Sequence, residues 1–149
     1  YDAMRSTEGA RLCEDILGRG RLILEYVDHV EKRSPDSVAE YRERIAARMT
    51  ELLDDTEIAQ QRILSEAALF ADKVSVTEEI VRLRSHIKQF ESMVTGKVPV
   101  GRKLDFLVQE MNREANTIGS KANDYDIAHT VVELKAEIEK IREQIQNLE

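Results

Sequence analysis

A regular apolar pattern near the C-terminus limits the possible folds of this chain more than any other feature. Large aliphatic residues recur there in alternating steps of four and three: Ile127, Val131, Leu134, Ile138, Ile141, Ile145 and Leu148. This spacing matches the a and d positions of a heptad repeat and predicts a helix over residues 126–148. Its apolar edge can pack within the same chain or against a second copy, and the pattern is compatible with both.

Apolar residues follow helical spacing in the rest of the chain as well. The expected helices cover residues 3–31, 35–52, 56–71, 77–94 and 102–121. Charged residues make up 34% of the sequence and aromatic residues 5%, and there is no tryptophan. Such a chain buries aliphatic side chains between charged helix faces. We therefore expect an all-α fold of long helices and helical hairpins, with a C-terminal antiparallel helix pair.

Several short segments predict where these helices are interrupted. Ser34, Pro35 and Asp36 form a typical helix start, so a new helix is expected there. The segment from Gly96 to Gly101 contains Pro99 and predicts a loop, and Asn123-Asp124 predicts the turn before the last helix.

Composition also limits the cellular setting and the partners. No stretch is long and apolar enough to cross a bilayer, and one cysteine, Cys13, cannot form an internal disulfide. These features favour a cytoplasmic protein without a membrane partner. The formal charge of −7 opposes nucleic-acid binding at long range. RNA binding would therefore depend on a local basic stripe.

The predicted helix over residues 102–121 has an unusual polar surface. Helical projection places Asp105, Gln109, Asn112, Arg113 and Asn116 together on one side. Glu110, Glu114 and Lys121 fall on the neighbouring side. Asparagine is a poor helix former, so these amides belong either to a buried polar network or to a ligand site.

The preceding predicted helix carries a second polar group. Glu79, Arg82, His86 and Gln89 form one stripe beside its apolar face. Neutral imidazole can bind a metal or accept a proton, although a single histidine near an acid is more often structural. The sequence lacks zinc-type Cys/His spacing, phosphate-binding glycine loops and a nucleophile elbow.

Four segments together resemble the C-terminal domain of the YicC/YloC family of bacterial endoribonucleases. They are Thr77–Leu83 with Ser85-His86, Gly101–Phe106, Gln109–Asn116, and Ser120-Lys121 with the closing Val132–Glu149. Two departures accompany the resemblance: the family's N-terminal half has no counterpart here, and Ser75 stands where the family commonly has aspartate.

The resemblance implies a helical extension over residues 1–72 and a C-terminal YicC-like domain over residues 73–149. It also implies a cytoplasmic endoribonuclease that depends on Mn²⁺ or Mg²⁺, cleaves single-stranded or structured RNA, and assembles as a homo-oligomer, a hexamer at full length. DNA is not an expected partner. Without its other half, the chain alone is expected to be inactive.

When the family's site residues are assigned to the matching positions of this sequence, the resemblance implies that the polar surface is the candidate active site. Glu79, Glu110 and Glu114 would hold the metal, and His86 would transfer a proton or act as a ligand. The cations expected to contact RNA phosphates are Arg102, Lys103, Arg113 and Lys121. Water and the ribose 2′-OH both stay open as the nucleophile. The alternative is a helical scaffold without catalysis, which forms oligomers or binds RNA.

Overall fold

Five α-helices make up almost all of the part of the chain that can be described. The computed structural model describes residues 2–52, 56–96 and 101–148, and the side chains within 9–52, 57–96 and 102–147. The helices are α1 (Asp2–Leu52), α2 (Thr56–Val74), α3 (Thr77–Thr95), α4 (Gly101–Lys121) and α5 (Tyr125–Leu148). These described residues contain no β-strand, which confirms the predicted all-α class.

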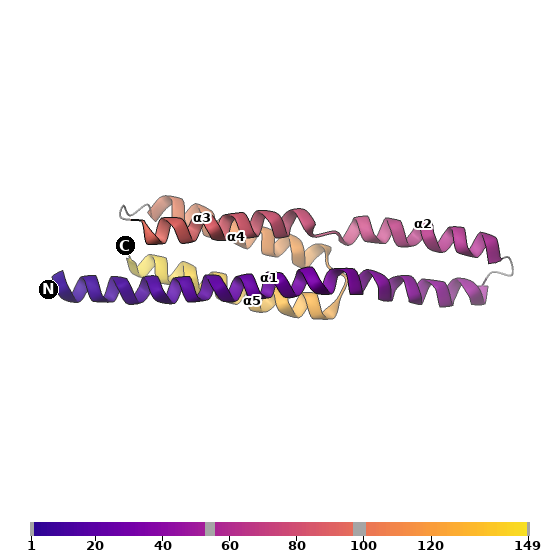
Figure 1. Cartoon of the computed structure of the whole chain (residues 1–149), viewed down its shortest axis with the longest axis horizontal. Helices are drawn as coiled ribbons and strands as arrows, with labels where there is room; N and C mark the ends of the chain where they lie inside the picture. Colours follow the sequence, from indigo (N-terminus) through magenta and orange to yellow (C-terminus); the bar gives the residue numbers. More distant parts are fainter. Residues whose placement is uncertain (1, 53–55, 97–100, 149) are drawn as a thin grey trace.

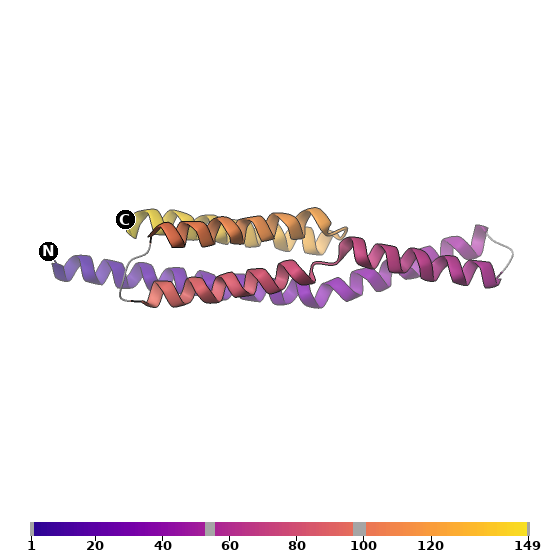
Figure 2. The same ribbon diagram turned by 90° about the horizontal axis from the view of Figure 1, so that it is seen from above.

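Four of the helices form an antiparallel bundle. The N-terminal half of α1 packs against α3 and α5, and α4 packs against the same two helices (Figures 1 and 2). The C-terminal half of α1 pairs with α2 in a hairpin that extends from one end of the bundle (Figure 1). The expected antiparallel packing of α4 on α5 is confirmed.

The apolar edge of α5 lies in the bundle core. Its residues from Ile127 to Ile145 in the heptad pattern are all buried, whereas the side chain of Leu148 lies outside the described part. Gly119 of α4 lets the two helices approach closely, because a Cβ there would lie 3.1 Å from Val131 Cγ1. The edge is therefore covered within this chain and is not free to form an oligomer interface.

The expected helix break at Ser34-Pro35-Asp36 is wrong, because α1 continues through Pro35. Proline removes a single backbone donor, and the helix on both sides keeps its tertiary contacts. Arg33 binds Asp124 at 2.8 Å and Glu40 at 2.7 Å, which fixes α1 on both sides of the proline. Tertiary packing therefore outweighs a strong local start signal.

The other predicted boundaries differ less from the structure. Residues Ser75-Val76 form the joint between α2 and α3, and α3 begins at Thr77. Asp124 caps α5, since its carboxylate accepts a hydrogen bond from the Ile127 backbone N–H at 3.1 Å. The expected loop falls largely on residues 97–100, outside the described part.

Two further expectations concern organisation and membranes. The proposed division after residue 72 falls close to the end of α2 at Val74 and stays a prediction. None of the described helices has the length and apolar character needed to span a bilayer.

Candidate functional site

The polar residues predicted on α3 and α4 meet along the edge where these two helices pack. Glu79, Arg82 and His86 lie on one side of α3, at steps of three and four. Because α4 runs antiparallel, the start of α3 meets the end of α4 (Figure 2). Three pairings result, in order along the edge: Glu79 with Lys121, Arg82 with Glu114, and His86 with Glu110 and Glu114.

Glu79 occupies the most buried position of this edge. Its side chain is 2% exposed, and Lys121 Nζ donates a hydrogen bond to Glu79 Oε1 at 2.5 Å. Burial alone would raise the pKa of Glu79. The hydrogen bond from Lys121, a backbone N–H and the charges of Lys121 and Arg82 outweigh that effect and lower the pKa. Glu79 is therefore held as a carboxylate.

Arg82 links three carboxylates at the middle of the edge. Its Nε lies 3.0 Å from Glu114 Oε1, and its terminal nitrogens lie 3.8 Å from Glu79 and 3.5 Å from Glu78. The hydrogen bond to Glu114 is the largest cause of the raised pKa of Arg82. Because Glu114 is itself buried, Arg82 fixes the position of this carboxylate.

His86, Glu110 and Glu114 form a cluster with metal-binding chemistry. One ligand atom from each lies within 4.8 Å of the other two. His86 and Glu110 are half-buried, so the cluster can be reached from solvent on one side. The Nδ1 atom of His86 is buried without a hydrogen-bond partner among the described residues, and the same holds for Glu79 Oε2.

The predicted site residues are only partly brought together. His86, Glu110 and Glu114 meet, whereas Glu79 lies outside this group and contacts Lys121 and Arg82 instead. The predicted phosphate contacts Arg102, Lys103 and Arg113 are exposed on α4, and Lys121 is paired with Glu79. Gln109, Asn112 and Asn116 are exposed too and form no buried network within the described part of this chain.

Arg82 is a residue of the candidate site that the sequence patterns did not predict. Helical spacing places it on the polar stripe of α3 but assigns it no role. The signal that could have pointed to it is its position three residues after Glu79 and four before His86, which places it between two candidate site residues on one helix face.

Removal of the lysine that neutralises Glu79 is expected to destabilise the fold. In Lys121→Met, a buried carboxylate loses its main partner, which should lower the free energy of unfolding by about 1–3 kcal/mol at neutral pH. The lowered pKa of Glu79 stabilises the fold above the unfolded-state pKa near 4.5. This contribution is lost as the pH falls through the folded-state pKa.

The difference between wild type and Lys121→Met should therefore shrink below about pH 4.5, as measured by urea unfolding at several pH values. Lys135→Met, at an exposed position of α5, is the matched control and should change stability little. If the difference in the free energy of unfolding between wild type and Lys121→Met stays constant down to about pH 3, the role assigned to the ion pair is contradicted.

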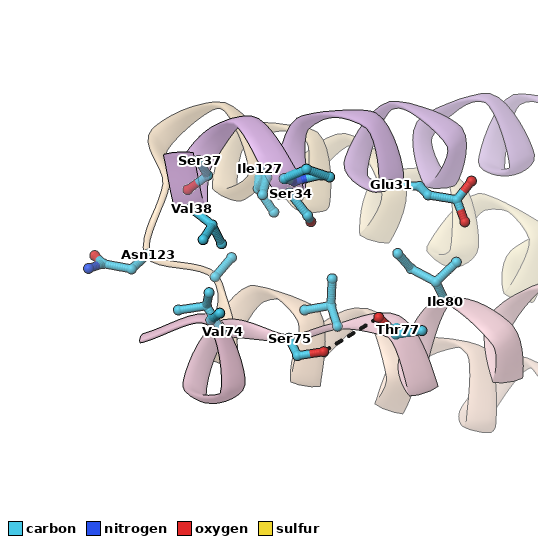
Figure 3. Close-up of a pocket in the computed structure, with 14 residues that line it drawn as sticks. Glu31, Ser34, Ser37, Val38, Val74, Ser75, Thr77, Ile80, Asn123 and Ile127 are labelled. Atoms are coloured by element: carbon cyan, nitrogen blue, oxygen red, sulfur yellow. Dashed lines mark hydrogen bonds between the residues drawn. The ribbon is translucent and has the colours of Figure 1, made fainter. Parts of the chain in front are cut away.

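A separate cavity of about 290 Å³ lies at the joint between α2 and α3, close to α1 and the α4–α5 turn (Figure 3). Ser34, Ser37, Ser75, Thr77 and Asn123 supply polar groups, and aliphatic side chains cover the remainder. Neither lysine nor arginine occurs among its described lining residues, and its carboxylate, Glu31, is paired with Arg84 at 2.6 Å. This cavity therefore lacks the charge needed to bind a phosphodiester.

Comparison with known proteins gives one family and several relatives. Residues 30–149 match the family model described as "Endoribonuclease YicC-like, C-terminal". The chain is 52% identical over 147 residues to a "Probable endoribonuclease YicC" of Clostridioides difficile, covering 98% of this chain and 50% of that protein. It is 41% identical to the protein with the same description in Haemophilus influenzae, covering 100% of this chain and 51% of that protein. The chain thus spans about half the length of these relatives.

Proposed function

The chain belongs to the family of YicC-like endoribonucleases, whose C-terminal region it matches, and from this premise we propose that it forms the C-terminal part of an endoribonuclease. The proposed activity depends on a divalent metal and cleaves single-stranded or structured RNA. The observation that carries the proposal is the convergence of His86, Glu110 and Glu114 on one solvent-accessible edge. The descriptions of the two relatives as probable endoribonucleases support the reaction class.

The chemistry of the three side chains fits Mn²⁺ or Mg²⁺. Carboxylate oxygens suit both ions, and an imidazole nitrogen beside them favours Mn²⁺. The Nδ1 atom of His86 is buried without a hydrogen-bond partner among the described residues, and a cation bound at that nitrogen would supply one. One ligand atom from each of the three side chains lies within 4.8 Å of the other two, so rotations of these side chains would allow them to hold one cation together.

The local charge supports cation binding at this edge. Glu78, Glu79, Glu110 and Glu114 supply four carboxylates, while Arg82 and Lys121 supply two cations. The remaining negative charge would repel RNA phosphate in the absence of a cation. A divalent cation held by Glu110 and Glu114 would offset this charge and allow the edge to receive a phosphodiester.

Each residue has a distinct part in the proposed reaction. A divalent cation would neutralise the charge that develops on the phosphate and help to activate the nucleophile. Arg82 positions Glu114, while His86 either joins the ligands or moves a proton at a ring nitrogen. Arg102, Lys103 and Arg113 are exposed and can contact phosphates along α4.

A scaffold without catalysis is the second candidate function. The observation in its favour is that Glu79 and Glu114 already have cationic partners, as they would in a purely structural helix pair. The unpartnered Nδ1 atom of His86 favours the enzyme, because a structural histidine would ordinarily have both ring nitrogens satisfied or solvated.

Incubation of the full-length protein with end-labelled RNA tests the proposed function. Products are expected with Mn²⁺, should disappear with EDTA, and should return when Mn²⁺ is added in excess. Cleavage that continues in EDTA would contradict the metal dependence. Binding of RNA without any cleavage would favour the scaffold.

The proposal also concerns the oligomeric state of the protein and its location in the cell. We expect the full-length protein to be a cytoplasmic homo-oligomer, a hexamer by the family resemblance. Since the apolar edge of α5 is buried within the chain, the contacts between copies must come from other surfaces. Light scattering of the full-length protein should give a mass several times that of one chain, and a monomer would contradict this expectation.

A further inference from the structure

The outward side of α4 carries an exposed aromatic residue between two arginines. Phe106 is 59% exposed, and Arg102 and Arg113 are exposed as well. Arg102, Phe106, Gln109 and Arg113 follow one another at steps of four, three and four, which places them on one stripe of the helix. The stripe lies opposite the core residues of α4, such as Met111.

The fold does not require phenylalanine at this position. The apolar face of α4 is complete without it, because Leu104, Leu107 and Val108 are buried in the bundle. Phe106 leaves most of its ring in water, where an apolar surface gains nothing from folding. Proteins that bind single-stranded nucleic acid combine aromatic rings that stack on bases with cations that contact the backbone, and Phe106 between two arginines offers both.

The stripe lies beside Glu110, one of the three residues of the cluster. Glu110 follows Phe106 by one helical turn, about 6 Å along α4. This offset is comparable with the length of one nucleotide. A base stacked on Phe106 would therefore place a neighbouring phosphodiester beside the cluster.

We propose that Phe106 stacks on an unpaired RNA base while Arg102 and Arg113 contact the phosphates on either side of it. The inference rests on the proposed function and names its substrate class as a single-stranded segment of RNA. Bases inside a duplex are covered on both faces by their neighbours, so they cannot stack on Phe106. Stacking also supplies the non-electrostatic attraction that a chain of net charge −7 needs to hold a polyanion.

The absence of tryptophan from this sequence allows a direct test. Phe106→Trp turns the full 149-residue chain into a protein with a single tryptophan on the stripe. A short unstructured RNA should quench its fluorescence, and a blunt duplex of the same sequence should quench it far less. Tyr125→Trp is the matched control, since Tyr125 is an aromatic residue with 87% exposure at the start of α5. Its fluorescence should not respond to either RNA.

Binding measured by the anisotropy of labelled RNA gives a second readout. Phe106→Ala should weaken binding of the unstructured RNA about 10- to 100-fold and leave the salt dependence unchanged. Arg113→Gln should reduce the salt dependence, because it removes a phosphate contact. Unchanged melting temperatures of these variants would show that the losses do not come from unfolding.

Three outcomes would overturn the inference. In the first, RNA binds the Phe106→Trp variant but does not quench its tryptophan fluorescence. In the second, the duplex quenches the fluorescence as strongly as the unstructured RNA does. In the third, the tryptophan side chain is already shielded from solvent by protein before RNA is added. If this chain binds no RNA while the full-length protein cleaves it, the inference fails and the proposed function survives. If the full-length protein neither binds nor cleaves RNA, the proposed function fails as well.

Discussion

Replacing both Glu110 and Glu114 by glutamine in the full-length protein is expected to reduce metal-dependent RNA cleavage by about 10³-fold or more. Glutamine preserves side-chain volume and helix preference but removes the charge that a hard cation requires. It can still accept the hydrogen bond that Arg82 donates to position 114. The fold should therefore remain intact, and initial rates with saturating Mn²⁺ measure the effect.

Glu139→Gln is the matched control for this double variant. Glu139 is exposed on α5 and pairs with Arg142 at 2.6 Å, away from the edge between α3 and α4. Its cleavage rate should equal that of wild type. A double variant that cleaves at the full rate would contradict the metal assignment and would favour a scaffold that presents RNA to another nuclease.

Phe90→Ala is expected to produce the largest loss of stability among single substitutions in the core, about 3–5 kcal/mol. The Phe90 side chain is 1% exposed and packs in the core of the bundle from α3. Its removal leaves a cavity where α3 packs against the rest of the bundle, and it also loosens the helix that carries Arg82 and His86. Urea unfolding followed by circular dichroism measures the change in the free energy of unfolding.

Phe106→Ala is the control, because it removes the same side chain from an exposed site. Its effect on stability should stay within about 0.5 kcal/mol. A large loss on replacing Phe106 would show that the ring packs against protein, and would also weaken the case for base stacking. Equal losses of stability in Phe90→Ala and Phe106→Ala would contradict the expectations for both residues, because these depend on Phe90 being buried and Phe106 being exposed.

The helices that form the site could be predicted from the sequence because their apolar residues keep helical spacing. This spacing predicts helices over residues 77–94, 102–121 and 126–148, and α3, α4 and α5 agree with these limits to within a residue or two. The predicted helix break at Pro35 is wrong, because the contacts that stabilise α1 there come from Asp124, far away in the sequence.

The site could be predicted only in part. Periodicity places His86 on one polar stripe, with Glu110 and Glu114 on another, but it cannot give the register between two antiparallel helices. This register decides that Lys121 meets Glu79, and that Arg82 rather than a cation from α4 meets Glu114. The exposure of Phe106 likewise depends on which side of α4 the other helices cover.

Binding of Mn²⁺ followed at the three histidines by NMR tests the proposed metal site most directly. The chain has three histidines, and His29 and His129 lie away from the cluster, beside Asp126 and Glu133 respectively. Substoichiometric Mn²⁺ should broaden the ring signals of His86 first in wild type, and this selectivity should disappear in the Glu110→Gln, Glu114→Gln variant. Equal broadening of all three histidines, or His86 signals that persist in wild type, would contradict the metal site.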